Sequence, residues 1–221
     1  MTKTKAYRNK RRQRKRGSDV GATSMAVVSN DFTVRSNLFN VNPLNSGGIR
    51  IRNMERWQAL DAGVAATSQP LAPFSFPYLK GLAANFGRYR WHSLKVIYKT
   101  AVATITPGQY AMGLTYSAGD APNTFSGIGS LAGAVTAPLW QNSELVMDGR
   151  STFPWYRFCD ATFFAALAGE STSAALVAQD SFVAAFFNQV STATAGTVSG
   201  ILFVEYDVEL IDPIQAADNV G

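Results

Sequence analysis

Cysteine and histidine are almost absent from this 221-residue chain, since each occurs once, as Cys159 and His92. A single cysteine excludes a disulfide within the chain and a zinc site built on cysteines. It is consistent with a reducing compartment. A Ser–His–Asp or Cys–His arrangement would have to use His92, and no Gly-x-Ser-x-Gly motif accompanies it. Cys159 follows Phe158 in an apolar setting, which predicts a buried, unreactive thiol. We therefore expect no catalytic residues and no enzyme activity.

Long apolar runs are also missing. No run approaches 18 apolar residues, so we expect neither a transmembrane helix nor a membrane partner. The basic N-terminus is not followed by an apolar segment, so we expect no secretory signal. The glycine-rich residues 126–130 lack the Gly-Lys-Ser/Thr ending of a phosphate loop.

Acidic residues are absent from the first sixteen positions, which carry nine basic ones: Lys3, Lys5, Arg8, Lys10, Arg11, Arg12, Arg14, Lys15 and Arg16. The whole chain has 20 Lys and Arg against 15 Asp and Glu, all of the acids lying from Asp19 onward. Taking the nine away leaves eleven cations, so residues 17–221 carry a formal charge of −4. This asymmetry indicates an arm for a polyanion, nucleic acid or an anionic membrane, and of the two we expect nucleic acid.

The composition of residues 1–16 predicts a disordered arm, because almost nothing there can be buried in a core. Nine charges on single-stranded nucleic acid predict a salt slope of up to about −6, at roughly −0.7 per phosphate. Tyr7 is the only ring, so base stacking should be minor and binding should tolerate any base sequence. A solubility tail and a nuclear-localisation signal are the alternatives, and localisation can coexist with binding.

Residues 17–47 predict an extended connecting arm with at most one strand, and residues 48–221 predict a compact β-rich domain. Alternating apolar residues indicate strands at 49–52, 89–99, 110–116, 135–147, 152–158, 182–190 and 202–210. In the last of these Glu205, Asp207 and Glu209 face away from an apolar side, which is typical of a surface or interface ladder rather than of a glycosidase pair.

Short helices interrupt the strands. Ser75 followed by Pro77 predicts the start of a helix that ends near Gly87. Residues 123–131 are a weaker candidate because of three glycines, and Asp160 can cap a helix over 160–168. About eight strands with one or two short inserted helices predict an all-β fold, an eight-stranded antiparallel jelly-roll sandwich with a disordered basic N-terminal arm.

One loop carboxylate stands out as a metal candidate. Asp120 follows the strand at 110–116, and a carboxylate in such a loop can bind Ca²⁺ between subunits if several more oxygen atoms join it. A turn-stabilising aspartate is the simpler interpretation. Apart from this weak calcium candidate, we expect no cofactor.

Several stretches resemble the coat proteins of small icosahedral plant RNA viruses of the sobemovirus and tombusvirus kind. The resemblance rests on residues 49–57, with Glu55; on 76–79 and 89–98; on 108–116 with 120–122 and 138–140; and on 200–213. Together they cover most of 48–213, and their order makes the match more specific than any one of them.

The resemblance implies a jelly-roll shell domain that assembles with copies of itself into a capsid, of the T=3 kind as a hypothesis, and encloses single-stranded RNA. It implies that the basic arm faces the RNA and that parts of 17–47 are ordered differently in different subunits. It implies a virion protein, made in the host cytoplasm, with nuclear entry through the arm left open. The family's calcium loop commonly reads Asp-x-x-Asp, whereas this chain has Ser117 at the first position and Asp120 at the second. Calcium would then need oxygens from Asp207, Asp212 or Asp218.

A cellular single-strand nucleic-acid-binding or lectin-like β-sandwich with a basic tail is the alternative at this point. The arm alone also leaves RNA and DNA undistinguished as cargo. The symmetry and shape of a particle, the host and any RNA sequence specificity stay open.

Overall fold

A computed structural model describes residues 40–44, 47–61, 65–147, 154–170, 172–192 and 198–214. The predicted basic arm at 1–16 and residues 17–39 of the connecting arm lie outside these ranges. Among the described residues, no helix is long and apolar enough to cross a membrane.

The described residues form ten strands: β1 (Asn40–Pro43), β2 (Ile49–Asp61), β3 (Thr67–Pro70), β4 (Phe86–Thr100), β5 (Gln109–Thr115), β6 (Val135–Pro138), β7 (Ser143–Val146), β8 (Tyr156–Arg157), β9 (Phe186–Ser191) and β10 (Val198–Pro213). Short helices lie between them: α1 (Pro77–Ala83), α2 (Phe125–Gly129), α3 (Ala161–Ala168) and α4 (Ser173–Asp180), with 3-10 turns η2 (Pro73–Ser75) and η3 (Ala118–Asp120).

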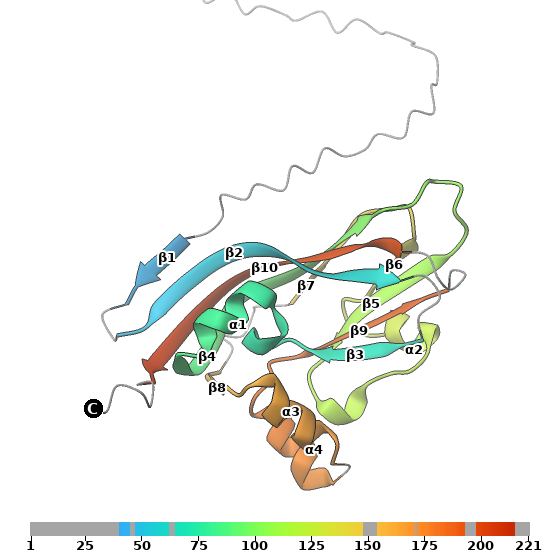
Figure 1. Ribbon diagram of the computed structural model, residues 1–221. Helices are drawn as coiled ribbons and strands as arrows, with labels where there is room; N and C mark the ends of the chain where they lie inside the picture. The colour runs from blue at the N-terminus through green and yellow to red at the C-terminus, as the bar shows by residue number, and fades with distance from the viewer. Residues whose placement is uncertain are drawn as a thin grey trace, which may run out of the picture. The chain divides into compact units, whose positions relative to one another are not determined.

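The strands form two antiparallel sheets (Figure 1). One has the order β1-β2-β10-β4-β7, with β8 also paired to β4, and the other has the order β3-β9-β5-β6. Without the short β1 and β8, these are two four-stranded sheets facing each other, so the predicted eight-stranded jelly roll is confirmed. β1 pairs with β2 and adds the end of the connecting arm to the larger sheet.

The core lies between the sheets and is built by alternation along the central strand β10. Leu202, Val204, Tyr206, Val208 and Leu210 are buried on one face of that strand. β10 is hydrogen-bonded to β2 on one side and to β4 on the other over most of its length. Burying each such side chain contributes about 1.5–3 kcal/mol.

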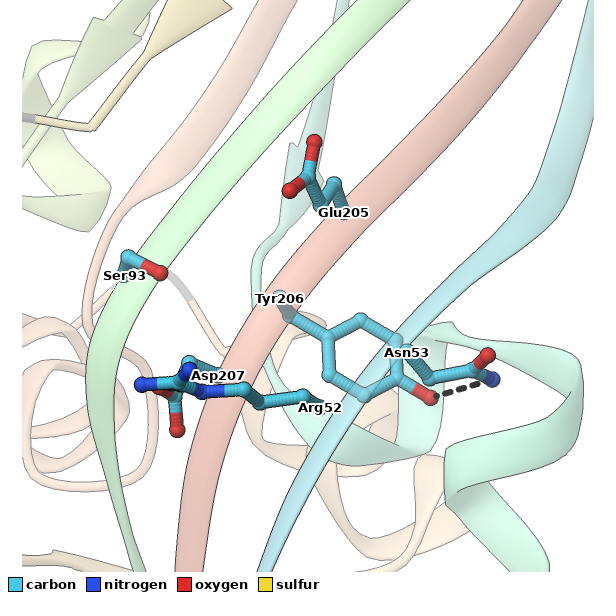
Figure 2. Close-up of a pocket in the computed structure, with 6 residues that line it drawn as sticks. All are labelled: Arg52, Asn53, Ser93, Glu205, Tyr206 and Asp207. Carbon is cyan, nitrogen blue, oxygen red and sulfur yellow. Dashed lines mark hydrogen bonds and ion pairs between the residues drawn. The ribbon is translucent and has the colours of Figure 1, made fainter. Parts of the chain in front are cut away.

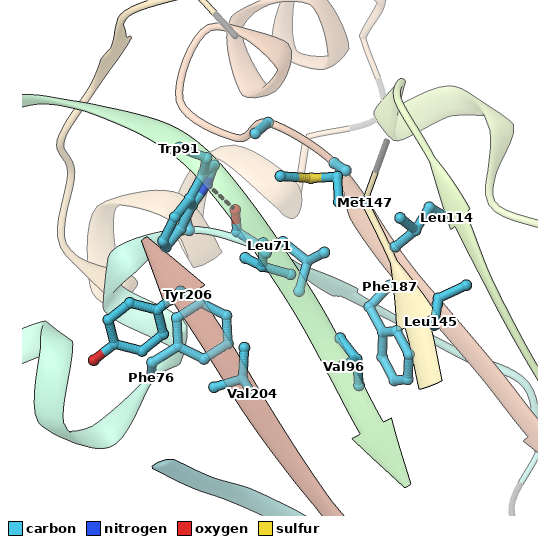
Figure 3. Packing of buried hydrophobic residues seen from close by; sticks show 14 of the residues in the cluster. Leu71, Phe76, Trp91, Val96, Leu114, Leu145, Met147, Phe187, Val204 and Tyr206 are labelled. Atoms are coloured by element: carbon cyan, nitrogen blue, oxygen red, sulfur yellow. Dashed lines mark hydrogen bonds between the residues drawn. The ribbon is translucent and has the colours of Figure 1, made fainter. Parts of the chain in front are cut away.

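Aromatic rings fill one half of this core (Figure 3). Phe76, Trp91 and Tyr206 contact one another, with ring centroids 5.9–6.0 Å apart. The ring centroid of Trp57 lies 5.3 Å from that of Phe76. The indole of Trp91 donates a hydrogen bond to the Leu71 carbonyl at 3.3 Å, so its polar atom is satisfied in the interior.

The helix predicted from Ser75 exists, but its expected ends are wrong. Phe76, not Ser75, precedes the first turn, and the Ser75 hydroxyl donates instead to the Pro70 carbonyl at 2.6 Å. The helix stops at Ala83 because the chain turns at Asn85, whose side-chain amide donates to the Gly81 and Leu82 carbonyls. Gly87 already belongs to β4.

The bounds of several predicted strands also differ from those in the structure. The strand predicted over 135–147 is split into β6 and β7 by a turn at 139–142, closed by a bond from Gln141 N–H to the Pro138 carbonyl. The strand predicted over 152–158 is only two residues long where it is described, at 156–157, and that predicted over 182–190 begins at Phe186.

Helix caps explain the remaining helices. Asp160 accepts from Phe163 N–H at 2.6 Å and confirms the predicted helix α3, and Thr124 caps α2 in the weaker candidate region. Helix α4 was not predicted, although Thr172 caps it by accepting from Ala175 N–H at 3.2 Å. α3 and α4 lie side by side below the sheets in Figure 1.

Gly200 is a position where β10 and β4 approach too closely for any side chain. A Cβ there would lie 2.3 Å from the ring of Tyr98 and 2.4 Å from the Lys99 carbonyl. We expect Gly200→Ala to lower the free energy of unfolding by about 1–3 kcal/mol, the usual range for overpacking. Urea denaturation of unassembled subunits measures it.

Gly81 is the matched control for that experiment, because a Cβ there meets nothing within 4 Å and the residue is in helix α1. Gly81→Ala should leave the protein as stable or make it slightly more stable, through higher helix propensity. Equal stability of the two variants would contradict the close approach at Gly200.

Candidate functional site

The outer face of the six-stranded sheet is a ladder of charges centred on β10. Its acidic residues Glu205, Asp207 and Glu209 point away from the core, and basic residues of β2 and β4 lie opposite them. The sequence pattern predicted the acidic face but not its partners, which are more than a hundred residues away along the chain.

Asp207 is the most enclosed member of this ladder, with 8% of its side chain exposed. Arg50 donates to it through Nε at 2.7 Å and through a second guanidinium nitrogen at 2.9 Å, and Arg52 donates through Nε at 2.5 Å. Figure 2 shows Arg52 reaching from β2 to the carboxylate on β10. Burial acts to raise the pKa of Asp207, but the two arginine hydrogen bonds outweigh it and lower the pKa.

A small polar pocket of about 250 Å³ lies beside Arg52 and Asp207. It is lined by Arg52, Asn53, Ser93, Glu205, Tyr206 and Asp207. Its carboxylates are not free, because Asp207 is bound by two arginines and Glu205 lies 3.6 Å from the amine of Lys95. Both carboxylates of the pocket thus have basic partners within the sheet.

Glu209 is the second carboxylate of the ladder that binds two basic side chains. It accepts from Arg90 at 2.6 Å and lies 2.9 Å from Nε2 of His92, and its pKa is lowered because these hydrogen bonds outweigh burial. The only histidine is thus bound to a carboxylate on a sheet surface. Cys159 is not part of this ladder. Its burial, with a smaller contribution from the charge of Asp160, raises the pKa of its thiol to about 12. A thiol of that kind is a poor nucleophile at neutral pH.

Glu55 faces the opposite way, toward the core side of β2. Its carboxylate accepts from the backbone N–H of Tyr78 at 2.7 Å and from the Tyr206 hydroxyl at 2.9 Å. It therefore occupies the start of α1 in place of the cap expected from Ser75. The function of this glutamate in the family-like stretch 49–57 is to join helix α1 to strands β2 and β10.

Asp120 lies at the end of η3 and is exposed. The loop before it is held by a residue that sequence reasoning missed: Asp180, at the end of α4. Its carboxylate accepts from the Ala118 N–H at 3.0 Å and from the Ser117 hydroxyl at 3.3 Å. No local signal could identify this pair, because Ser117 and Asp180 are 63 residues apart.

Calcium takes six to eight oxygen ligands, so Asp120 alone would be one of several. The described residues contain no group of three or more acidic, histidine or cysteine side chains that could hold a metal ion. Asp207 and Asp212 are bound to arginines, and Asp218 lies outside the described residues.

The Asp207 cluster generates a test of stability. We expect Asp207→Asn to lower the free energy of unfolding at pH 7 by about 2 kcal/mol, because it leaves Arg50 and Arg52 without their counter-charge; solvent reaching both arginines keeps the loss below that of a fully buried pair. Since the folded-state pKa of Asp207 is lowered, its contribution is present above the unfolded value of about 3.9 and is lost as the pH falls below it.

Urea denaturation of both proteins between pH 3 and 7 measures this difference. It should be constant above about pH 5 and shrink as the pH falls through 4. Asp212→Asn is the matched control, because its pair with Arg88 is half exposed and asparagine tolerates the positive φ of 60° at this position. A pH-independent difference for Asp207→Asn would contradict the assignment.

Comparison with known proteins identifies the family. The family model of the viral coat protein S domain matches residues 30–216. The capsid protein of Poinsettia latent virus is 25% identical over 95% of this chain and 76% of its own length, and that of Tobacco necrosis virus strain D is 28% identical over 70% and 62%. This chain thus spans less than two thirds of the length of the Tobacco necrosis virus strain D capsid protein.

Solved structures agree on the fold. A Tobacco necrosis virus structure superimposes with a TM-score of 0.71 at 23% identity, covering 85% of this chain and 92% of that one. The structure of Cocksfoot mottle virus has a TM-score of 0.61 at 16% identity, covering 75% and 93%. Because the family model spans most of the chain, and its two sheets have the jelly-roll order, the protein belongs to the viral coat protein family and is a capsid protein that forms the shell.

Proposed function

We propose that copies of this chain assemble with one another into a closed shell and package single-stranded RNA through the basic segment 1–16. The family match over residues 30–216 carries the proposal, because it makes the body a shell domain and leaves the polycationic arm attached to it. The cellular single-strand-binding or lectin-like alternative has no comparable support.

The distribution of charge supports an arm that does the binding. On the sheet face, Arg50, Arg52 and Arg90 are already paired with carboxylates of β10. The nine cations of the arm have no acidic residue among them. Phosphate is therefore expected to bind the arm in preference to the body, whose net charge is −4.

Assembly would change the strength of that binding. One arm with nine charges is a modest polyanion binder, whereas many arms tethered to one shell bind one RNA molecule multivalently. Affinity then comes from avidity rather than from reading bases, so any RNA of suitable length should compete. The protein is a structural component of the virion, present in the host cytoplasm before assembly, and its basic cluster also has the composition of a nuclear-import signal.

The arm is tested by replacing its nine Lys and Arg with Gln and, separately, by scrambling residues 1–16. We expect the Gln variant to lose RNA packaging while its body stays folded, and the scrambled arm to package normally, because phosphate contacts depend on charge and not on order. The salt slope of RNA binding should fall from about −6 toward zero in the Gln variant. Nuclease-protected RNA in purified particles is the readout.

Normal RNA packaging by the Gln variant would contradict the proposed role of the arm. Loss of packaging by the scrambled arm would instead mean that specific side-chain positions matter.

Calcium is tested separately. We propose that no cofactor is required, because Asp180 already holds the loop at 117–118 through hydrogen bonds, and Asp120 is left as the weak candidate ligand. Particles treated with a calcium chelator should keep their sedimentation rate. Chelator-induced swelling that added calcium reverses would contradict this proposal. If Asp120→Asn also abolished the response to calcium, the result would establish a calcium site completed by a second copy.

A further inference from the structure

A groove of about 570 Å³ lies between the ends of α1 and β10, strand β8 and helix α3. Two of its side chains are large, apolar and half exposed, since Phe163 is 52% exposed and Ile214 is 56% exposed. The volume is that of an ordinary binding pocket, and most of the lining is apolar. The described residues that line it are Ala84, Arg157, Phe158, Cys159, Asp160, Phe163, Phe182 and Ile214.

Arg157 is the cation of this groove, and the ion pairs of the described residues do not include it. It lies directly opposite Arg88 where β8 pairs with β4, and Arg88 is bound to Asp212. Asp160 already caps α3 by accepting from Phe163 N–H at 2.6 Å. Like charges directly opposite on neighbouring strands are unfavourable, so a further carboxylate beside Arg157 would be stabilising.

The end of β10 leads the chain into this groove. Pro213 still pairs with Phe86 at the start of β4, and the N–H of Ile214 donates to the Asn85 carbonyl at 2.8 Å. The side chain of Ile214 is itself part of the groove wall. The residues that follow, 215–221, lie outside the described ranges and start at this wall.

The composition of residues 215–221 matches the groove. Asp218 is the charged residue of this segment and Val220 its large apolar one, and the rest are Gln, Ala, Asn and Gly. Seven extended residues span up to about 25 Å, at roughly 3.3–3.6 Å each, so the segment is long enough to cross several side chains. Because it is tethered at the groove, its effective concentration there is on the order of millimolar, which favours it over the same segment of another copy.

We propose that residues 215–221 dock in the groove of their own subunit, with Asp218 paired to Arg157 and Val220 against Phe163 and Phe182. The docked segment joins the end of β10 to β8 and α3 and covers Cys159. The inference concerns each subunit by itself and does not depend on the proposed assembly or RNA packaging.

Cys159 makes a specific test possible, because it is the only cysteine of the chain. In full-length Val220→Cys, copper–phenanthroline should oxidise the thiols of residues 159 and 220 to an intrachain disulfide, with two electrons passing to the oxidant and two protons to solvent. Such a bond requires the two Cα atoms to come within about 7 Å of each other. A monomer of higher mobility on a non-reducing gel reports it.

Val146→Cys is the matched control, since Val146 is 58% exposed and lies opposite Lys95 on β4. Lys95 is seven residues (95 − 88) from Arg88, the partner of Arg157, or about 23 Å at roughly 3.3 Å per residue. This variant should form no intrachain disulfide.

A charge swap tests the ion pair. Added to Val220→Cys, either Asp218→Arg or Arg157→Asp should slow the cross-link, and the two together should restore its rate, because the opposite charges then face each other again.

The thiol itself gives a second readout. Deleting residues 215–221 should speed the reaction of Cys159 with N-ethylmaleimide about tenfold, because a segment docked nine-tenths of the time leaves the thiol open for one-tenth. Val220→Ser should speed it less, and thermal unfolding checks that both variants are folded.

A cross-link of Val220→Cys as slow as that of Val146→Cys, with no change in thiol reactivity on deletion, would overturn the docking. A disulfide-linked dimer in place of the intrachain bond would assign the groove to the segment of a second copy. Fast cross-linking that neither single charge change slows would overturn the pairing of Asp218 with Arg157.

Discussion

The pairing of β10 with β2 on one edge and β4 on the other is the constraint on which the structure depends. It fixes the register in which Leu202, Val204 and Tyr206 enter the core, and a shift of one residue would move the whole apolar set to the outer face. The same register brings Asp207 between Arg50 and Arg52. Core packing and the charge ladder are therefore two consequences of one strand alignment.

Charge is organised differently on the parts of this protein, and each arrangement suits a different contact. The outer sheet face carries many ions, but its central carboxylates are neutralised within the subunit by Arg50, Arg52 and Arg90. The N-terminal segment 1–16 carries cations alone. In the proposed shell, the cations that face RNA would be those of the N-terminal segment.

Two carboxylates join elements that are distant in sequence. Glu55 binds the start of α1 and the Tyr206 hydroxyl, and Asp180 binds the loop that precedes Asp120. Both act through backbone N–H groups, which have no sequence signature of their own. For this reason the sequence pattern predicted Ser75, not Glu55, at the start of the helix. It also pointed to Asp120 as the functional carboxylate of its loop and gave no signal for Asp180.

The sequence by itself determined the fold class, the alternation of β10, helix α3 with its Asp160 cap and the buried thiol of Cys159, because each depends on neighbours within a few residues. It also determined the charge of the arm and the family likeness. Only the tertiary structure decided the partners of Asp207 and Glu209, the split of the predicted strand at 135–147 and the unpredicted helix α4. These depend on which strands lie side by side, and that is set by packing between residues far apart in the chain.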